Sequence, residues 1–415
     1  MITSLSCGRG WGVVLLLIGA PVSASALAAD APAALPSNGG MAAKLQPFVK
    51  DNVIAGAVVL VADKDKVLDL EAVGYRDLAT KKPMQTTDLF YIASMTKTFT
   101  AAGLMMLVDE GKLALDDPVE KYLPEFKGQM VQEEAAQPHP PKHPITIREV
   151  MSHTAGLRGG PVPGDTLEAF VKELAKRSLE FEPRTKYKYS PGPAVGGRII
   201  EVVSGIPYPQ YLQQRLLDPL GLKDTTFWPS AEQASHLALT HKLNPTTKTF
   251  EPLHNTPPHA EYMPPIIASQ FGGSVAAAYR RHFGNPAGGL FSTAADVGRF
   301  CQMLLNGGIY QGKKYLSPAA IKEMSSLQTG SLALGDEGYG IGCFVQQKAR
   351  AGVPSVGSFG HHGARKTQMW IDPRNQLVMV LMVQCWELTH KQQTDLYTAY
   401  RQQAIARYGK SRGSP

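Results

Sequence analysis

The sequence predicts an α+β fold, in which an antiparallel sheet is flanked by helices and a mostly helical lobe is inserted between its strands. Apolar runs typical of strands occur near both ends of the chain, as pairs at 55–62 with 67–73 and at 366–371 with 377–383. Each pair is joined by a short polar turn, which favours antiparallel hairpins. The segment from about 116 to 290 instead has helical spacing and many prolines. We expect a cleft where this lobe meets the sheet.

The first third of the chain supplies a helix, a hairpin and a second helix. A helix is expected at 41–50, and the turn of the hairpin is Asp63-Lys64-Asp65-Lys66. The second helix covers 98–110 and begins just after Ser94. Its apolar residues lie on more than one face, so we expect it to be buried on both sides.

The rest of the chain alternates helices with late strands. Helices are expected at 146–151, 166–178, 195–204, 209–217, 293–305 and 389–406, with another that begins at Ser317-Pro318. Strands are expected at 341–346 and 355–361, ahead of the final hairpin. The segment 241–289 is rich in Pro, Gly and His, and irregular stretches of this length usually serve a binding site or are mobile.

The N-terminus is typical of a secretory signal peptide over residues 1–28. Arg9 supplies the positive region, residues 13–18 form the apolar core, and Ala26-Leu27-Ala28 is a small-residue cleavage site. Cleavage would give an exported protein of the periplasm or extracellular space without a stable membrane span. The alternative is an uncleaved membrane anchor, although the apolar run is too short to span a bilayer well.

Cleavage would leave a linker at 29–40 and a single domain at 41–410, which contains the helical insertion at about 116–290. The chain has a net charge of +7, and most of its basic residues are scattered. No nucleic-acid-binding motif accompanies them. We therefore expect a small-molecule or peptidoglycan-derived substrate rather than nucleic acid, with a weak attraction to anionic envelope polymers.

Cysteine spacing offers no metal or dithiol site. Cys301, Cys343 and Cys385 would remain in the mature chain, and no Cys-x-x-Cys occurs. Buried free thiols are expected, and one disulfide with one free thiol is the alternative. The adjacent His361 and His362 have no third or fourth ligand at a suitable spacing, so we expect neither a metal nor another cofactor.

The stretch Ser94-Met95-Thr96-Lys97 is the strongest candidate for catalysis. Positions i and i+3 share a helix face, so the Lys97 amine can reach the Ser94 hydroxyl. The helix N-terminus favours the negative charge that develops during acyl transfer. The alternative is a helix-capping serine beside a surface lysine.

Two further stretches could complete the site. Tyr189 lies in Tyr187-Lys188-Tyr189-Ser190-Pro191, and a lysine ammonium nearby would depress its pKa, so that it could take the serine proton. The stretch Phe359-Gly360-His361-His362-Gly363-Ala364 ends a strand, where glycines allow close approach of a ligand. The N–H groups of Ala364 and Ser94 could then hold an oxyanion. The alternatives are packing tyrosines and a polar strand end.

Six stretches together resemble the serine β-lactamase-like hydrolases, which include class C β-lactamases, D-alanyl-D-alanine carboxypeptidases and related esterases. They occur in the family's order and cover about residues 45–385: Ile92-Ala93-Ser94-Met95-Thr96-Lys97, Asp117-Pro118-Val119-Glu120-Lys121-Tyr122-Leu123-Pro124, Ser152-His153-Thr154-Ala155-Gly156-Leu157, Asp218-Pro219-Leu220-Gly221-Leu222, Gly289-Leu290-Phe291-Ser292-Thr293-Ala294 and Gly360-His361-His362-Gly363.

The resemblance implies a role for each matching residue. Ser94 would be the acylated nucleophile, Lys97 would deprotonate or orient it, and Tyr189 would be the catalytic tyrosine. His361 takes the place of the lysine in the family's Lys-Thr-Gly, as in many esterase-like members. Gly363 matches the third position of that motif, and Ala364 would be the second oxyanion donor.

Two departures from the family pattern bear on the substrate. Pro191 stands where the family usually has an Asn that contacts both the lysine and a substrate amide, and proline has no donor. Ester cleavage is therefore favoured over amide or β-lactam cleavage. Arg365 and Lys366 stand where small residues are usual, and Arg365 could bind a substrate carboxylate in a bidentate contact.

The sequence thus predicts a metal-free, exported serine hydrolase that works through an acyl-enzyme. Its substrate would be a small ester, a D-amino-acid peptide or a β-lactam. The alternative is a catalytically impaired member of the family that binds peptidoglycan fragments or a partner, because one fold can host many functions.

Overall fold

The structure is a computed structural model that describes residues 40–410, except 135, 161, 163, 245–246, 248–249, 253–282, 333 and 351. By its contacts the chain divides into Met1–Ala34 and Leu35–Pro415, and every described residue belongs to the second unit. The expected signal peptide and residues 29–39 of the expected linker lie outside the described residues, so these boundaries remain predictions. In the part of the chain that is described, no helix has the length and apolar character to cross a membrane.

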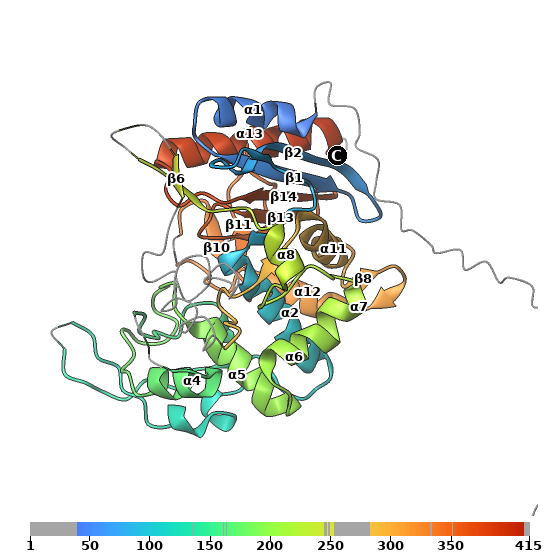
Figure 1. Cartoon of the computed structure of the whole chain (residues 1–415). Helices are drawn as coiled ribbons and strands as arrows, with labels where there is room; N and C mark the ends of the chain where they lie inside the picture. Colours follow the sequence, from blue (N-terminus) through green and yellow to red (C-terminus); the bar gives the residue numbers. More distant parts are fainter. Residues whose placement is uncertain are drawn as a thin grey trace, which may run out of the picture. The chain divides into compact units, whose positions relative to one another are not determined.

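Eight antiparallel strands form the central sheet, in the order β10-β11-β12-β13-β14-β1-β2-β3. Their bounds are β1 Gly56–Ala62, β2 Val67–Asp77, β3 Lys82–Pro83, β10 Glu337–Tyr339, β11 Phe344–Gln346, β12 Phe359–His362, β13 Gln368–Asp372 and β14 Leu377–Val383. Ala57 lies opposite Val383 and Ala62 opposite Val378, so the two ends of the chain pair in the middle of the sheet (Figure 1). This confirms the predicted fold class.

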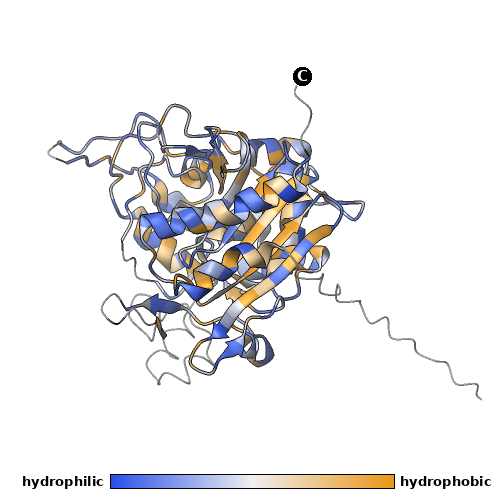
Figure 2. Cartoon of the chain, turned by 90° about the horizontal axis from the view of Figure 1, so that it is seen from above, coloured by the Kyte–Doolittle hydropathy of each residue, from blue (hydrophilic) through white to orange (hydrophobic). Residues whose placement is uncertain are grey.

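The two faces of the sheet belong to separate apolar clusters because successive strand residues point to opposite sides. Val58 and Leu60 join the larger cluster, with helices α2 (Thr96–Asp109) and α11 (Ala294–Leu305). Val59 and Val61 face the smaller cluster, beneath α1 (Met41–Lys50) and α13 (His390–Tyr408). Figure 2 shows the orange, apolar strands beneath these two outer helices. The central strands are therefore buried on both faces.

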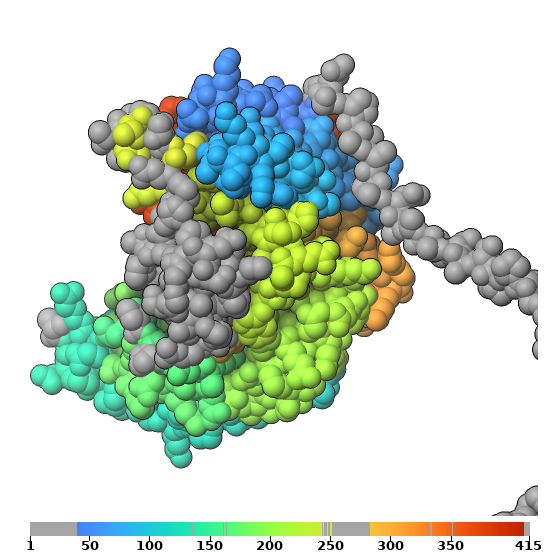
Figure 3. All heavy atoms as spheres, in the orientation of Figure 1, coloured from blue at the N-terminus to red at the C-terminus, as the bar shows by residue number. Residues whose placement is uncertain are grey.

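The helical part lies on the α2 side of the sheet (Figure 1). Its helices are α3 Ile147–Met151, α4 Leu167–Ala175, α5 Gly192–Ser204, α6 Tyr208–Leu212, α7 Asp218–Leu220, α8 Ala231–Ser235 and α12 Pro318–Ser325. Single turns occur at η1 Ala93–Met95, η2 Val119–Lys121, η3 Pro124–Phe126 and η4 Gln213–Leu217. Figure 3 shows the blue strand residues above the green helical residues, with yellow-green residues on the face between them.

Short strand pairs complete the described elements: β4 Phe90–Tyr91 with β7 Phe291–Ser292, β5 His241–Leu243 with β6 Phe250–Pro252, and β8 Ile309–Tyr310 with β9 Lys313–Lys314. The pairing of β4 with β7 matters for the site because it holds the segment before Ser94. The N–H of Ile92 donates to the Leu290 carbonyl (3.0 Å). The Leu290 N–H in turn donates to the Thr96 hydroxyl (3.1 Å), so these two segments are fixed together.

Several expected boundaries were wrong, although the elements exist. The expected helix at 209–217 is α6 followed by a wider π-helical turn, η4. The expected strand at 341–346 is only β11, because Gly342 has a φ of +69° and the chain turns there to pair with β10. The expected strand at 355–361 shortens to β12.

Candidate active site

Ser94 lies in the single turn η1, immediately before α2. The residue before it, Ala93, has a φ of +46° and is almost fully buried. A non-glycine residue in this left-handed region is strained, and such strain often accompanies a functional position. The turn presents the half-buried Ser94 side chain at the start of the helix.

Lys97 is the central group of the site. Its Nζ lies 3.0 Å from Ser94 Oγ and donates to the Ala287 carbonyl. It also lies 4.6 Å from the centre of the Tyr189 ring. The side chain is only 3 % exposed, and burial lowers its pKa to about 7. An amine with this pKa is largely neutral just above pH 7 and can accept a proton.

Tyr189 also lies beside Ser94, because its hydroxyl forms a hydrogen bond with the Ser94 side chain. The expected depression of its pKa was wrong. Burial around the hydroxyl raises the pKa of Tyr189 well above its usual value, and the bond to Ser94 only partly opposes this. The residue as a whole is 43 % exposed, although its hydroxyl is desolvated. Tyr189 is therefore a neutral phenol, which can relay a proton but does not store a negative charge.

The segment Asn285–Leu290 supplies a backbone hydrogen-bond acceptor for Lys97 that the sequence did not reveal. The Ala287 carbonyl accepts from Lys97, and the Pro286 carbonyl accepts from the Thr100 hydroxyl (2.7 Å). Pro191 occupies the N-cap position of α5, and its side chain has no hydrogen-bond donor or acceptor. The Ala287 carbonyl therefore binds Lys97, and position 191 has no amide side chain that could do so.

His361 is fully buried, and both of its ring nitrogens have protein partners. Nδ1 lies 2.8 Å from the His362 carbonyl, and Nε2 lies 3.0 Å from the Tyr339 hydroxyl. A carbonyl only accepts, so Nδ1 carries the proton and Nε2 accepts from Tyr339. Burial, with a smaller contribution from the charges of His362 and Lys97, lowers the pKa of His361 well below its usual value. Its predicted contact with substrate remains a prediction.

Gly363 brings the end of β12 against the nucleophile segment. A Cβ atom there would lie 2.5 Å from the Ile92 carbonyl oxygen, so no larger residue fits without movement. Ala364 follows in an exposed turn, and among the described residues its N–H has no acceptor. The residue before Ala364 lies against Ile92, two residues before Ser94, and the role of the Ala364 N–H as an oxyanion donor remains a prediction.

Arg365 is buried rather than exposed, at 5 % of its surface. Its guanidinium carbon lies 4.1 Å from the centre of the Trp386 ring. Burial lowers the pKa of Arg365 to about 10, so the group is still charged at neutral pH. Within the described part of the chain, no acceptor or carboxylate binds this guanidinium.

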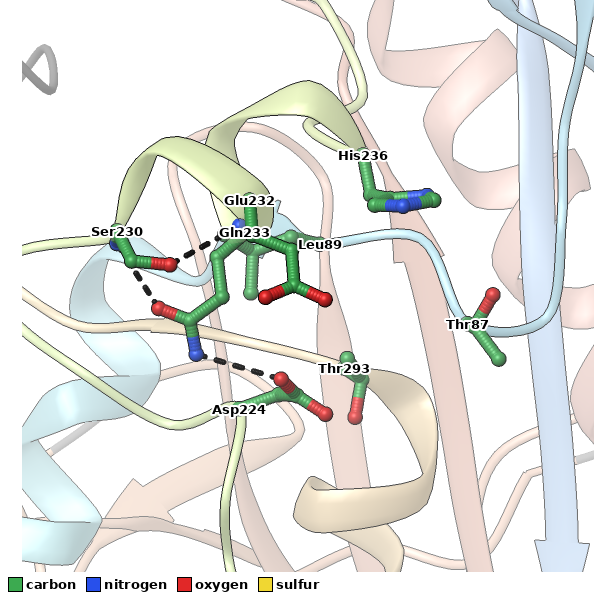
Figure 4. Close-up of a pocket in the computed structure, with 8 residues that line it drawn as sticks. All are labelled: Thr87, Leu89, Asp224, Ser230, Glu232, Gln233, His236 and Thr293. Carbon is green, nitrogen blue, oxygen red and sulfur yellow. Dashed lines mark hydrogen bonds between the residues drawn. The ribbon is translucent and has the colours of Figure 1, made fainter. Parts of the chain in front are cut away.

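A cavity of about 500 Å³ lies between the segment at Thr87, α8 and the start of α11. Its lining residues are Thr87, Leu89, Asp224, Ser230, Glu232, Gln233, His236 and Thr293 (Figure 4). Gln233 is fixed by a capping box with Ser230 and by Asp224. None of the predicted site residues lines this cavity, and it contains no paired nucleophile and base.

The described residues contain no group of three or more His, Cys, Asp or Glu side chains that could hold a metal ion. Cys301, Cys343 and Cys385 are free and buried, as expected. Burial raises the pKa of each of these thiols, which makes them poor nucleophiles.

Comparison with known proteins supports the resemblance. The model of the Beta-lactamase family matches residues 41–403. This chain belongs to the Beta-lactamase family. Protein Rv1367c of Mycobacterium tuberculosis is 31% identical, over 83% of this chain and 89% of that protein.

Other members of the Beta-lactamase family have names that state an activity. Lovastatin esterase of Penicillium rubens is 28% identical, over 69% of this chain and 72% of that protein. The solved structure of EstCE1, named as a hydrolase with promiscuous acyltransferase activity, has a TM-score of 0.73 and 26% identity. It covers 87% of this chain and 97% of that one. The present chain is thus a serine hydrolase of the Beta-lactamase family.

The low pKa of Lys97 can be measured directly. In protein labelled with ¹³C at the lysine ε carbon, we expect one resonance to titrate with a midpoint near 7. A lysine side chain in water titrates at about 10.4, so a midpoint near 7 is readily recognised. This resonance should vanish in Lys97→Met and persist in Lys121→Met, which removes an exposed lysine. A midpoint above 9 for the Lys97 resonance would contradict the inferred burial.

Proposed function

We propose that the protein hydrolyses small esters through an acyl-enzyme on Ser94. The observation that carries this proposal is the 3.0 Å separation of Lys97 Nζ and Ser94 Oγ, together with a lysine pKa of about 7. A neutral Lys97 donates one N–H to Ala287 and keeps a lone pair for the Ser94 proton. Serine therefore becomes nucleophilic without a carboxylate or a metal ion.

The reaction divides into two steps. In the first, Ser94 Oγ attacks the ester carbonyl carbon, and its proton passes to Lys97. The tetrahedral oxyanion accepts from the N–H groups of Ser94 and Ala364, the C–O bond to the alcohol breaks, and Tyr189 relays the proton to the departing oxygen. In the second step water attacks the acyl carbon and its proton passes to Lys97. The bond between the acyl carbon and Ser94 Oγ then breaks, Ser94 Oγ takes up a proton through Lys97 and Tyr189, and the carboxylic acid leaves.

Pro191 and Ala287 support esters over amides as substrates. Ala287 replaces one contact of the missing Asn, because its carbonyl accepts from Lys97. The other contact, to a substrate amide, has no replacement on the Pro191 side chain. An alcohol also leaves more readily than an amine, so an ester depends less on contacts that orient the leaving group. A D-amino-acid peptide and a β-lactam are the less favoured substrates.

We also propose that the protein is exported, with its signal peptide cleaved after Ala28. The support is the composition of residues 1–28, since the structure describes none of them. N-terminal sequencing of the secreted or periplasmic form should begin at Ala29. A mature protein that keeps Met1 would contradict this proposal.

Covalent labelling tests the nucleophile. We expect a fluorophosphonate probe to add one phosphonyl group to the wild-type protein and none to Ser94→Ala, because the half-buried Ser94 hydroxyl lies 3.0 Å from the Lys97 amine, whereas Ser190, which lies beside His153, is buried. Turnover of p-nitrophenyl butyrate should fall by roughly 10³-fold or more in that variant. The measurements are intact-protein mass spectrometry and initial rates.

Ser235→Ala is the matched control, because Ser235 is an exposed serine at the end of α8. It should label and turn over like the wild type. A wild-type protein that labels but shows no turnover would favour the alternative of an impaired, binding-only protein. Equal labelling of Ser94→Ala would overturn the mechanism.

Among the described residues the guanidinium of Arg365 packs on Trp386 and has no carboxylate partner, which supports a preference for substrates that carry a carboxylate. A largely buried charge without a counter-ion is costly, and a substrate carboxylate would relieve that cost. Trp386 supplies the only ring found against Arg365 among the described residues. Glu387, which acts electrostatically on the adjacent Lys366, is paired with Lys242 (3.2 Å) and is not free to serve Arg365.

Matched esters test this preference. We expect kcat/KM for the p-nitrophenyl monoester of glutaric acid to fall roughly 10- to 100-fold in Arg365→Ala, the range of one charge-assisted hydrogen bond. The neutral butyrate ester should be hardly affected. Arg365→Lys should recover only part of the loss, because lysine lacks the bidentate fork. Lys366→Ala is the control, and equal losses on both esters in Arg365→Ala would refute the preference.

A further inference from the structure

His153 occupies an unusual backbone position at the end of α3. Its φ is +62°, in the left-handed region, and the Thr154 N–H donates back to the Glu149 carbonyl (2.9 Å). This is the hydrogen bond of a Schellman cap, in which the left-handed position is usually glycine. A glycine would avoid the strain, so the His153 side chain must contribute something that offsets it.

The contacts of His153 converge on Tyr189. The His153 carbonyl accepts from the Lys188 N–H (3.0 Å), and Nδ1 accepts from the Ser190 N–H (3.1 Å). The imidazole ring lies 4.5 Å from the Tyr189 ring, measured between centres. One residue therefore binds the backbone N–H groups of both neighbours of Tyr189 in the chain and packs against the tyrosine itself.

The protonation of His153 is fixed by the same contacts. Nδ1 receives a peptide N–H, so the ring proton is on Nε2, which has no hydrogen-bond partner. The side chain is 1 % exposed, and burial, followed by the charge of Lys97, lowers the pKa of His153 well below its usual value. A neutral ring, whose Nδ1 lone pair accepts from Ser190, is thus the stable form.

The other side of the ring connects Tyr189 with the strand that carries the predicted oxyanion donor. Tyr339 lies edge-on to His153, with 4.7 Å between ring centres. Its hydroxyl donates to His361 on β12. The contacts His153–Tyr339–His361 therefore link the tyrosine segment and the end of β12 through buried side chains.

We propose that His153 is a positioning residue for the hydrolysis: it holds the Tyr189 hydroxyl against Ser94 and the Tyr189 ring against Lys97. The proposal rests on the function proposed above. His153 touches neither Ser94 nor, in the proposed reaction, the substrate. Its effect is exerted through the placement of Tyr189, where a displacement of about 1 Å can cost 10²-fold in rate.

Three substitutions separate this role from simple packing. His153→Gly removes the ring and the Nδ1 acceptor but relieves the backbone strain, and we expect kcat to fall on the order of 10²-fold with little change in KM. His153→Asn keeps an acceptor at the δ position and tolerates the left-handed backbone, so it should recover most of the loss. His153→Gln places its oxygen one bond further out and should recover much less.

A double-substitution cycle gives the decisive readout. If His153 acts through Tyr189, then His153→Gly should cause no further loss of kcat in a Tyr189→Phe background. Gln311→Gly is the control, because Gln311 also has a left-handed backbone (φ +48°) in the β8–β9 turn. That control should keep wild-type kcat, and thermal unfolding should show that each variant is folded.

Three outcomes would overturn the proposal. They are a folded His153→Gly enzyme with kcat within twofold of the wild type, equal activity of the Asn and Gln variants, and full additivity with Tyr189→Phe. Each is distinguishable from a failure of the proposed function, because that failure would appear in Ser94→Ala as retained labelling and turnover. If His153→Gly does not fold, the comparison of Asn with Gln still decides.

Discussion

The burial of Lys97 without a carboxylate is the constraint on which the rest of the site depends. An ammonium group that is 3 % exposed loses its hydration, and its described partners are a serine hydroxyl, a backbone carbonyl and an aromatic ring. A carboxylate partner would have stabilised the charged form and kept the pKa high. With neutral partners the amine titrates near neutrality, so the protein obtains a base from a residue that is ordinarily an acid.

The surrounding groups are consistent with this single titrating amine. His153 and His361 are both buried and neutral, and the charge of Lys97 contributes to lowering their pKa values. Tyr189 and Tyr339 are neutral because burial raises the pKa values of their hydroxyls. A proton that leaves Ser94 therefore has one favourable acceptor nearby. The polarity of the site is carried by hydrogen bonds rather than by fixed charges, which limits its dependence on ionic strength.

Local patterns in the sequence predicted the contact between Ser94 and Lys97, and tertiary effects explain what they missed. The i, i+3 spacing of Ser94 and Lys97 is a property of one helix turn, so their contact follows without knowledge of the fold. The hairpins at both ends of the chain are equally local. The pKa of Tyr189 was predicted in the wrong direction, because the desolvation of its hydroxyl depends on elements far away in the chain. The Ala287 carbonyl had no side-chain signature at all, and only its Pro- and Gly-rich surroundings marked it.

Three of the eight non-glycine residues with positive φ in the described part of the chain lie at the proposed site. Ala93, His153 and Lys366 are non-glycine residues with φ between +46° and +70°. Ala93 precedes Ser94, His153 holds the segment of Tyr189, and Lys366 follows Arg365 in the turn that begins at Gly363. Each of these positions would be less strained with glycine. A strained turn that is held by buried contacts on both sides has little freedom to move. The side chains at these three positions therefore fit a site that gives up local stability to place its reacting groups accurately.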